Sequence, residues 1–339
     1  MTIVIGVDAH KKSHTLVAVD ATGRKLAQKT IATTSEDHAL AVQWARIAFG
    51  DDLVWAVEDC RTLTARLERD LLTSGHKVIR VPPHLMSRSR ASSRERGKSD
   101  PIDALAVARV TQREPDLPIA SHDPISIELR LLIDRREDLV AQRTATINRL
   151  VWRIHLLDPL HQTPANWNVQ KAHKILGEWL ATHHGLVAEL ARDELEDVVR
   201  LSGEILALRR RIEKNVRPIA PRLIALQGCG ELTAARIIAE VANIKRFRSE
   251  AAFARYAGLA PIPHTSGSAT VRLRPSRHGN RRLNSAIHRI AITQTVHGGL
   301  GQDYFRRRVA EGDNRQRALH ALKRRLARVV FSCLQAQAT

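Results

Sequence analysis

Four carboxylates in the first third of the chain stand where the sequence predicts the end of a strand or the start of a helix. Asp8 follows an apolar run rich in β-branched residues, and Glu58 follows a second run of the same kind. Asp100 and Asp103 lie three residues apart behind Ser99, which can cap a helix. Because residues three apart share one helix face, both aspartates are expected on the same side of its first turn.

Four carboxylates brought together repel one another unless cations neutralise them. Hard oxygen ligands select Mg²⁺ or Mn²⁺, and a pair of such ions suits phosphodiester chemistry. We therefore predict that Asp8, Glu58, Asp100 and Asp103 bind the metal and form a catalytic site. Each residue alone has a plainer explanation, such as Asp8 ending a strand or Asp100 balancing a helix dipole. Their joint placement favours the metal site.

A second group of reactive residues lies in the last quarter of the chain. Ser266 stands in a Ser-Gly loop, with Arg272 and Arg274 after it and Arg281 and Arg282 at the start of a helical pattern. A serine hydroxyl there can attack a phosphate, and guanidinium groups can stabilise the developing charge. On the residues alone, a serine that only forms a turn is the simpler interpretation. The arginines are candidate phosphate contacts, with a solvated basic face as the alternative.

A helix, Gly-x-Gly turn, helix pattern precedes this loop, in residues 223–234. Gly228 and Gly230 permit positive φ and leave backbone N–H groups available to a DNA phosphate. The pattern predicts a helix-hairpin-helix that binds nucleic acid. An ordinary helical packing unit is the alternative.

The composition points to a polyanionic partner. The 339 residues contain 54 Lys and Arg against 35 Asp and Glu, a formal charge of +19, and 43% are hydrophobic, enough for a folded core. A strongly basic folded chain most often binds nucleic acid. The three cysteines lie too far apart in sequence for a disulfide framework or a thiolate metal site. No run is apolar enough to span a membrane, so we expect a soluble cytoplasmic protein.

The predicted secondary structure that must position these residues changes along the chain, from mixed strands and helices to long helices. Residues 1–115 read as β-β-β-α-β-α-β-α, a mixed sheet with helices packed on it, in which Ser35 caps the first helix. A basic stretch, residues 87–98, fits either a solvated loop or one that contacts phosphate.

Residues 120–215 carry heptad seams, the first of which includes Arg136 and Arg143. Two antiparallel helices and an intermolecular coiled coil would each fit these seams. Residues 220–339 are mostly helical and end in an arginine-rich tail. We therefore predict an α/β domain, a helical coiled-coil segment and a mostly helical C-terminal domain, with these three boundaries.

The sequence resembles the IS110-type transposases, including the IS1111 group, which are DEDD recombinases of bacterial insertion sequences. The resemblance spans nearly the whole chain. Where many members carry Ala-Thr-Gly after the glutamate, residues 59–61 read Asp-Cys-Arg, which we expect to alter packing and not the metal site. The motifs that carry the resemblance are Ile5–Asp8, Val57–Glu58 and Lys98–Ala104 in the first half, and Ala257–Pro261, Ser266–Gly267 and Arg277–Leu283 in the second.

The resemblance implies an RNase H/RuvC-like first domain that holds the four carboxylates, with Ser266 as nucleophile of the last domain. It implies a transposase that cuts and rejoins DNA through a serine–DNA phosphodiester, with Mg²⁺ or Mn²⁺ as cofactor. The implied partners are the double-stranded DNA of element ends and target, a structured guide RNA as in some members, and further copies in a homodimer or homotetramer. The active site can then combine residues of different protomers.

Two other functions remain open at this point. A RuvC-like Holliday-junction endonuclease would use the carboxylates and water, but leaves the serine segment unexplained. A non-catalytic nucleic-acid-binding protein would need no Mg²⁺, so a metal titration separates it from the enzymes. An actin-like ATPase would share the first strands, but the sequence has no matching second phosphate loop.

Overall fold

The computed structural model describes residues 2–58, 61–83, 85–86, 99–114, 117–121, 123–264, 272–275 and 279–337. The basic stretch 87–98 and the Asp-Cys pair at 59–60 therefore lie outside the described residues. The chain divides into two compact units, each built from two segments. These are Met1–Asp123 with Ala242–Arg281, and Pro124–Val241 with Arg282–Thr339.

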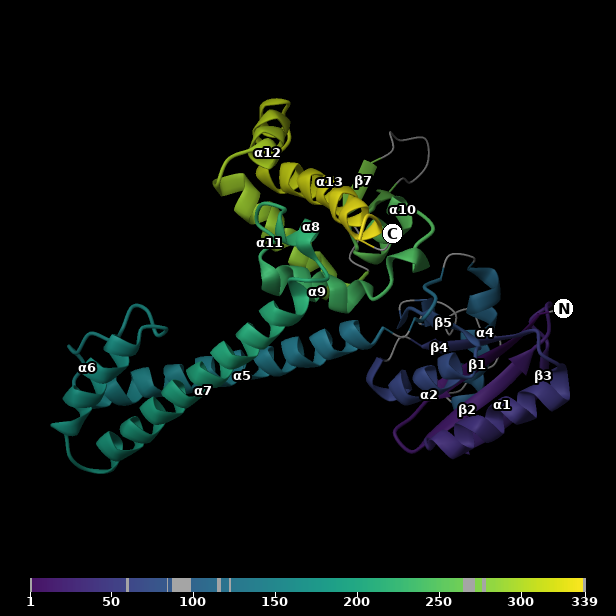
Figure 1. The fold of residues 1–339 in the computed structure, drawn as a ribbon, viewed down its shortest axis with the longest axis horizontal. Helices are drawn as coiled ribbons and strands as arrows, with labels where there is room; N and C mark the ends of the chain where they lie inside the picture. Colours follow the sequence, from purple (N-terminus) through teal and green to yellow (C-terminus); the bar gives the residue numbers. More distant parts are fainter. Residues whose placement is uncertain are drawn as a thin grey trace. The chain divides into compact units, whose positions relative to one another are not determined.

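The first segment folds around a five-stranded mixed sheet of order β3-β2-β1-β4-β5 (Figure 1). The strands β1, β2 and β3 pair antiparallel, while β4 and β5 run parallel to β1. This topology confirms the RNase H/RuvC-like mixed sheet and the order of elements predicted from the sequence. The strand bounds are β1 Ile3–Ala9, β2 Ser13–Val19, β3 Lys25–Ala32, β4 Leu53–Glu58 and β5 Lys77–Val81.

Helices cover both faces of this sheet. Helices α1 (Ser35–Phe49) and α2 (Arg61–Thr73) share one core with Ile5 and Val7 of β1, and α4 (Asp100–Arg113) shares the other with Val4. Neighbouring residues of β1 thus enter opposite cores, as the two-residue period of a strand requires.

The start of α1 differs from the expectation that Ser35 caps it. Thr34 is the N-cap, and its Oγ1 accepts a hydrogen bond of 3.1 Å from the Asp37 N–H. Ser35 is already inside the helix. Two adjacent hydroxyl residues offer the same cap, and only the backbone conformation decides between them.

Helix α4 lies unusually close to β1 because of Gly6. A Cβ built on Gly6 would lie 2.6 Å from the backbone N of Ala108 and closer still to the carbonyl oxygen of Ala104. Both of these are backbone atoms of α4, so no side-chain rotation could relieve the overlap. The glycine therefore fixes how near the helix, and the carboxylates at its start, come to the sheet.

The second unit is built on two long helices, α5 (Pro124–Leu157) and α7 (Leu186–Val216), with α6 (Gln170–Ala181) between them in sequence. Ion pairs show that the two long helices are antiparallel. Arg211, near the end of α7, contacts Glu128 near the start of α5, and Glu194, near the start of α7, contacts Arg153 near the end of α5. The heptad seams thus pair within one chain, one of the two arrangements that the sequence allowed. Helix α6 was not predicted, and Leu176 and Leu180 join it to a core with α5 and α7. Figure 1 shows α6 beside the ends of these two helices that are joined through it in sequence.

One guanidinium nitrogen of the seam arginine Arg143 has two polar partners. Its Nη1 donates to Ser202 Oγ at 3.2 Å and to Asn168 Oδ1 at 3.0 Å. For Arg136, burial lowers the pKa, and the nearby guanidinium groups of Arg209, Arg143 and Arg289 lower it further. The seam therefore places positive charge between two helices that also meet through apolar contacts and ion pairs.

The remaining described elements are helices of different lengths and the antiparallel pair of β6 and β7. Helix α9 packs on α5, where Ser126 donates to the carbonyl of Ile238 at 3.1 Å. No helix in the described ranges is long and apolar enough to cross a membrane. The bounds are α8 Pro221–Ile224, α9 Glu231–Val241, the 3-10 helix η1 Ile244–Arg246, α10 Glu250–Tyr256, β6 Pro261–His264, β7 Arg272–Pro275, α11 Arg281–Val296, α12 Leu300–Ala310 and α13 Arg315–Gln335.

Candidate active site

The ends of β1 and β4 bring Asp8 and Glu58 to one edge of the sheet. The last registered pair of these parallel strands is Val7 with Val57, and each carboxylate follows one residue later. Ala56 faces the α4 core, as Val4 does. Since side chains two residues apart share a face, Asp8 and Glu58 both point to the side that α4 covers.

The first turn of α4 supplies the other two carboxylates. Asp100 and Asp103 both belong to this turn. Pro101, which has no N–H, occupies an early position where a backbone N–H would find no acceptor within the helix. Ser99 is the N-cap by backbone conformation but makes no side-chain cap hydrogen bond. Its carbonyl accepts from the Asp103 N–H at 3.1 Å, so the turn is held by the backbone.

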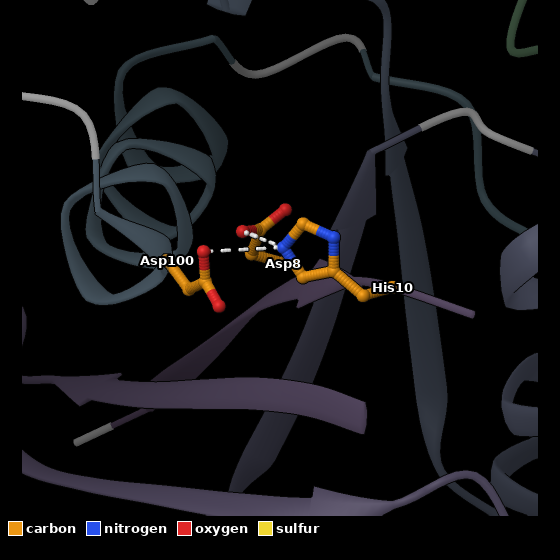
Figure 2. A group of neighbouring side chains, drawn as sticks. All are labelled: Asp8, His10 and Asp100. Carbon is orange, nitrogen blue, oxygen red and sulfur yellow. Dashed lines mark hydrogen bonds and ion pairs between the residues drawn. The ribbon is translucent and has the colours of Figure 1, made fainter. Parts of the chain in front are cut away.

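A histidine that the sequence analysis did not select joins this group. The Nε2 atom of His10 lies 3.0 Å from Asp8 Oδ2 and 3.2 Å from Asp100 Oδ1, as Figure 2 shows. One potential ligand atom from each of the three side chains falls within 4.8 Å of the others. The Asp8 side chain is 13% exposed, whereas His10 and Asp100 are about half exposed. The group therefore has one mostly covered member, Asp8, and two members that are open to solvent.

The electrostatics of this group favour a cation. Burial raises the pKa of Asp8, the nearby His10 opposes this shift, and the charges of Asp103 and Asp100 raise it further. The carboxylate of Asp8 raises the pKa of His10 in return. Asp8, Asp100 and Asp103 thus interact electrostatically in the folded chain, and Glu58 lies beside Asp8 by strand register. A divalent ion would offset the cost of burying the Asp8 charge and its repulsion by Asp103 and Asp100.

The raised pKa of Asp8 predicts a stability change in the metal-free protein. A carboxyl whose pKa is higher in the folded state binds its proton more tightly there, so its ionised form costs stability once the pH exceeds that pKa. His10, whose pKa is also raised, offsets this cost while it is protonated and stops doing so as the pH rises through its own pKa. Asp8→Asn should therefore raise the melting temperature more at pH 8 than at pH 5.

Thermal denaturation in EDTA at the two pH values measures this difference. A gain that is larger at pH 5 than at pH 8 would contradict the assignment of a buried, ionised Asp8.

The serine loop lies mostly outside the described residues. Ser266 belongs to 265–271, which joins β6 to β7 in sequence, and only the backbones of Arg272 and Arg274 are described, paired with His264 and Ile262. The position of Ser266 relative to the four carboxylates therefore lies outside the described residues. Arg281 is exposed at the start of α11.

Arg282 is engaged within its own unit. Its Nη1 lies 2.6 Å from Asp134 Oδ1 of α5 and 3.9 Å from Glu240 Oε1 of α9. With about half of the side chain exposed, this guanidinium ties α11 to two other helices. A phosphate contact by Arg282 would have to compete with these carboxylates.

The Gly-x-Gly turn has a packing role in the structure. Gly228 has φ +84°, the positive value expected, and a Cβ there would meet Thr293 and the carbonyl oxygen of Ile290 in α11. A Cβ on Gly230 would meet open space. The turn separates α9 from α8, which has only four residues.

Comparisons with known proteins match both halves of the chain to one family. A profile of the IS110-type DEDD transposases matches residues 5–158, and a profile described as transposases of the IS116/IS110/IS902 family matches residues 220–306. Among curated proteins, an uncharacterized 44.8 kDa protein of insertion element IS116 from Streptomyces clavuligerus is 28% identical, covering 98% of this chain and 94% of its own.

Another relative comes from insertion element IS900 of Mycobacterium paratuberculosis. This uncharacterized 42 kDa protein is 25% identical over 97% of this chain and 95% of its own length. Among solved structures, Thermus thermophilus RuvC in complex with a Holliday junction covers 35% of this chain and 100% of its own, with 16% identity and a TM-score of 0.29.

Proposed function

Because this chain belongs to the IS116/IS110/IS902 transposase family and is a DNA transposase, we propose that it cuts and rejoins DNA by a metal-dependent reaction through a serine–DNA link. The observation that carries the proposal is the convergence of acidic side chains at one edge of the sheet. Strand register sets Asp8 beside Glu58, and the first turn of α4 adds Asp100 and Asp103.

These four residues fit a hard divalent cation. They offer carboxylate oxygens alone, the donor set that Mg²⁺ and Mn²⁺ prefer, and the burial of Asp8 makes an uncompensated charge costly. Such an ion, when bound, polarises the scissile phosphate and lowers the pKa of a nearby hydroxyl. Asp8, Glu58, Asp100 and Asp103 would hold it, which makes them the proposed metal ligands and part of the catalytic site.

In this reaction Ser266 acts as the nucleophile. Its Oγ attacks the phosphorus, the bond from phosphorus to the 3′-oxygen breaks, and a 5′-phosphoserine link and a free 3′-OH result. The proton lost from Oγ is balanced by the one that the 3′-oxygen gains. The reverse step on a second duplex rejoins the DNA and restores the serine hydroxyl.

We assign contacts with the phosphate backbone of nucleic acid to the basic residues of the last domain. We infer that Arg272, Arg274, Arg281 and Arg282, with the turn of Gly228 and Gly230, contact phosphates of element ends and target DNA. The charge of +19 is ample for two nucleic acids and supports a structured guide RNA as a second partner.

The three segments then divide the work. Residues 1–115 carry the metal site, residues 120–215 join protomers into a homodimer or homotetramer, and residues 220–339 carry the serine and DNA contacts. The reaction takes place on DNA in the bacterial cytoplasm. A site shared between protomers would unite Ser266 with carboxylates of another copy.

One gel experiment tests the serine step. Supercoiled plasmid carrying this gene with its natural flanks is incubated with protein, RNA expressed from those flanks, and Mg²⁺. A denaturing gel should show protein-linked DNA for the wild type and none for Ser266→Ala, because alanine lacks the attacking hydroxyl. The control Ser268→Ala, two residues away in the same loop, should keep the adduct.

The outcome also separates the competing functions. Nicking without an adduct, unchanged in Ser266→Ala, would favour the Holliday-junction endonuclease. Binding of the same plasmid without any metal-dependent cleavage would favour a non-catalytic binding protein.

A further inference from the structure

We propose that His10 is a nitrogen ligand of the ion held by Asp8 and Asp100, and that it makes this site prefer Mn²⁺ to Mg²⁺. The inference rests on the proposed function, since it assumes a metal at the edge where β1 meets α4. It adds to the four carboxylates a fifth side chain of a different chemical kind.

The distances around His10 fit neighbouring positions on one octahedral ion. With metal–ligand distances of about 2.1 Å, two adjacent ligand atoms of an octahedral ion lie about 3.0 Å apart. The Nε2 atom lies 3.0 Å from Asp8 Oδ2 and 3.2 Å from Asp100 Oδ1, and all three ligand atoms fall within 4.8 Å (Figure 2). The imidazole therefore lies at a ligand's separation from both carboxylates without moving to another rotamer.

The backbone places His10 for this role. His10 follows β1 immediately, two residues after Asp8, and its own N–H donates to the carbonyl of Ser13 at 2.9 Å, closing the turn into β2. That bond extends the antiparallel ladder past the end of β1, so the alternation of side chains carries His10 to the side of Asp8. About half of the imidazole is exposed, which leaves room for the small shift that coordination needs.

A nitrogen ligand changes which ion the site prefers. Mg²⁺ binds through carboxylates, phosphates and water, whereas the affinity of imidazole-containing sites rises along the first-row transition metals from Mn²⁺ onward. Four carboxylates alone serve Mg²⁺ and Mn²⁺ alike. Adding an imidazole should shift the balance toward Mn²⁺, and removing it should shift the balance back.

Pulsed electron paramagnetic resonance of the full-length protein loaded with Mn²⁺ alone tests the ligand directly. The wild type should show a nitrogen hyperfine coupling that changes when histidine is labelled with ¹⁵N. The coupling should vanish in His10→Ala and persist in the control His155→Ala, which removes an exposed histidine of α5. None of these measurements depends on cleavage of DNA.

Competition between the two ions supplies the second measurement. The Mg²⁺ concentration that displaces half of the Mn²⁺ should be at least about tenfold higher for the wild type than for His10→Ala, a factor that loss of even an indirect metal contact can produce. His10→Asp, which exchanges the nitrogen for an oxygen, should still bind Mn²⁺ but give no nitrogen coupling.

The outcomes distinguish this inference from the proposed function beneath it. Mn²⁺ that binds the wild type without nitrogen coupling, or coupling that survives in His10→Ala, would overturn the role of His10 and leave the carboxylate site standing. Failure of the wild type to bind Mn²⁺ would overturn both.

Discussion

Asp8→Asn is expected to lower DNA strand cleavage by a factor of about a thousand or more while binding to the same DNA stays within about twofold. A bound metal supplies several kcal/mol of charge stabilisation to a phosphoryl reaction, and each 1.36 kcal/mol is worth about tenfold in rate. Asp8 is the least exposed side chain of the Asp8–His10–Asp100 group. Asparagine keeps the shape of the side chain but withdraws the negative charge from the ion.

Cleavage of supercoiled plasmid and a gel-shift titration on the same DNA measure the two properties. The control is Asp51→Asn, which changes an exposed aspartate that pairs with Arg46 just before β4, at the opposite end of that strand from Glu58. This variant should leave cleavage and DNA binding unchanged. Because Asp8→Asn should also stabilise the metal-free fold, unfolding cannot account for the expected loss. Full cleavage by Asp8→Asn would refute the metal site.

Gly6→Ala is expected to destabilise the fold by about 3 kcal/mol and to lower cleavage at least about a hundredfold. The added methyl would overlap the backbone of α4 at Ala104 and Ala108, so the helix must move away from β1. Overpacking of a core costs about 1–3 kcal/mol, and here only a backbone shift can relieve it. A displacement of about 1 Å at a reacting group can cost a hundredfold in rate, and the start of α4 carries two of the proposed ligands.

Urea denaturation and plasmid cleavage at a temperature where the variant stays folded measure the two effects separately. Gly203→Ala is the matched control, because a Cβ there meets no atom within 4 Å and the residue lies in the middle of α7. It should be neutral or stabilising by about 0.5–1 kcal/mol. Wild-type stability and cleavage in Gly6→Ala would show that the contact between α4 and β1 does not position the site.

The parts of the fold that the sequence predicted are those in which local pattern and tertiary environment agree. The strands around Asp8 and Glu58 are short apolar runs because both of their faces are buried, by α1 and α2 on one side and α4 on the other. The heptads of α5 and α7 repeat because the two helices meet along one line. The spacing of Asp100 and Asp103 is a local property of one helical turn.

The parts that escaped prediction depend on partners far away in sequence. The spacing of two residues between Asp8 and His10 at the end of a strand was enough to place both side chains on one face. Its second partner, Asp100, reaches it only because α4 packs against Gly6. The heptad pattern likewise left open whether the seam partner lay in the same chain, since an apolar stripe does not specify which helix covers it.

The antiparallel pairing of α5 and α7 has a consequence for synthesis on the ribosome. Arg143 of α5 and its partner Ser202 of α7 are separated by 59 residues. At about 5–20 residues per second, α5 waits roughly 3–12 s before the matching part of α7 is made. During that interval the apolar stripe of α5, which includes Leu139, Leu150 and Ile154, is not yet packed against α7. Nascent chains therefore pass through a stage in which chaperones, or the same stripe on a neighbouring nascent chain, compete with α7 for this helix.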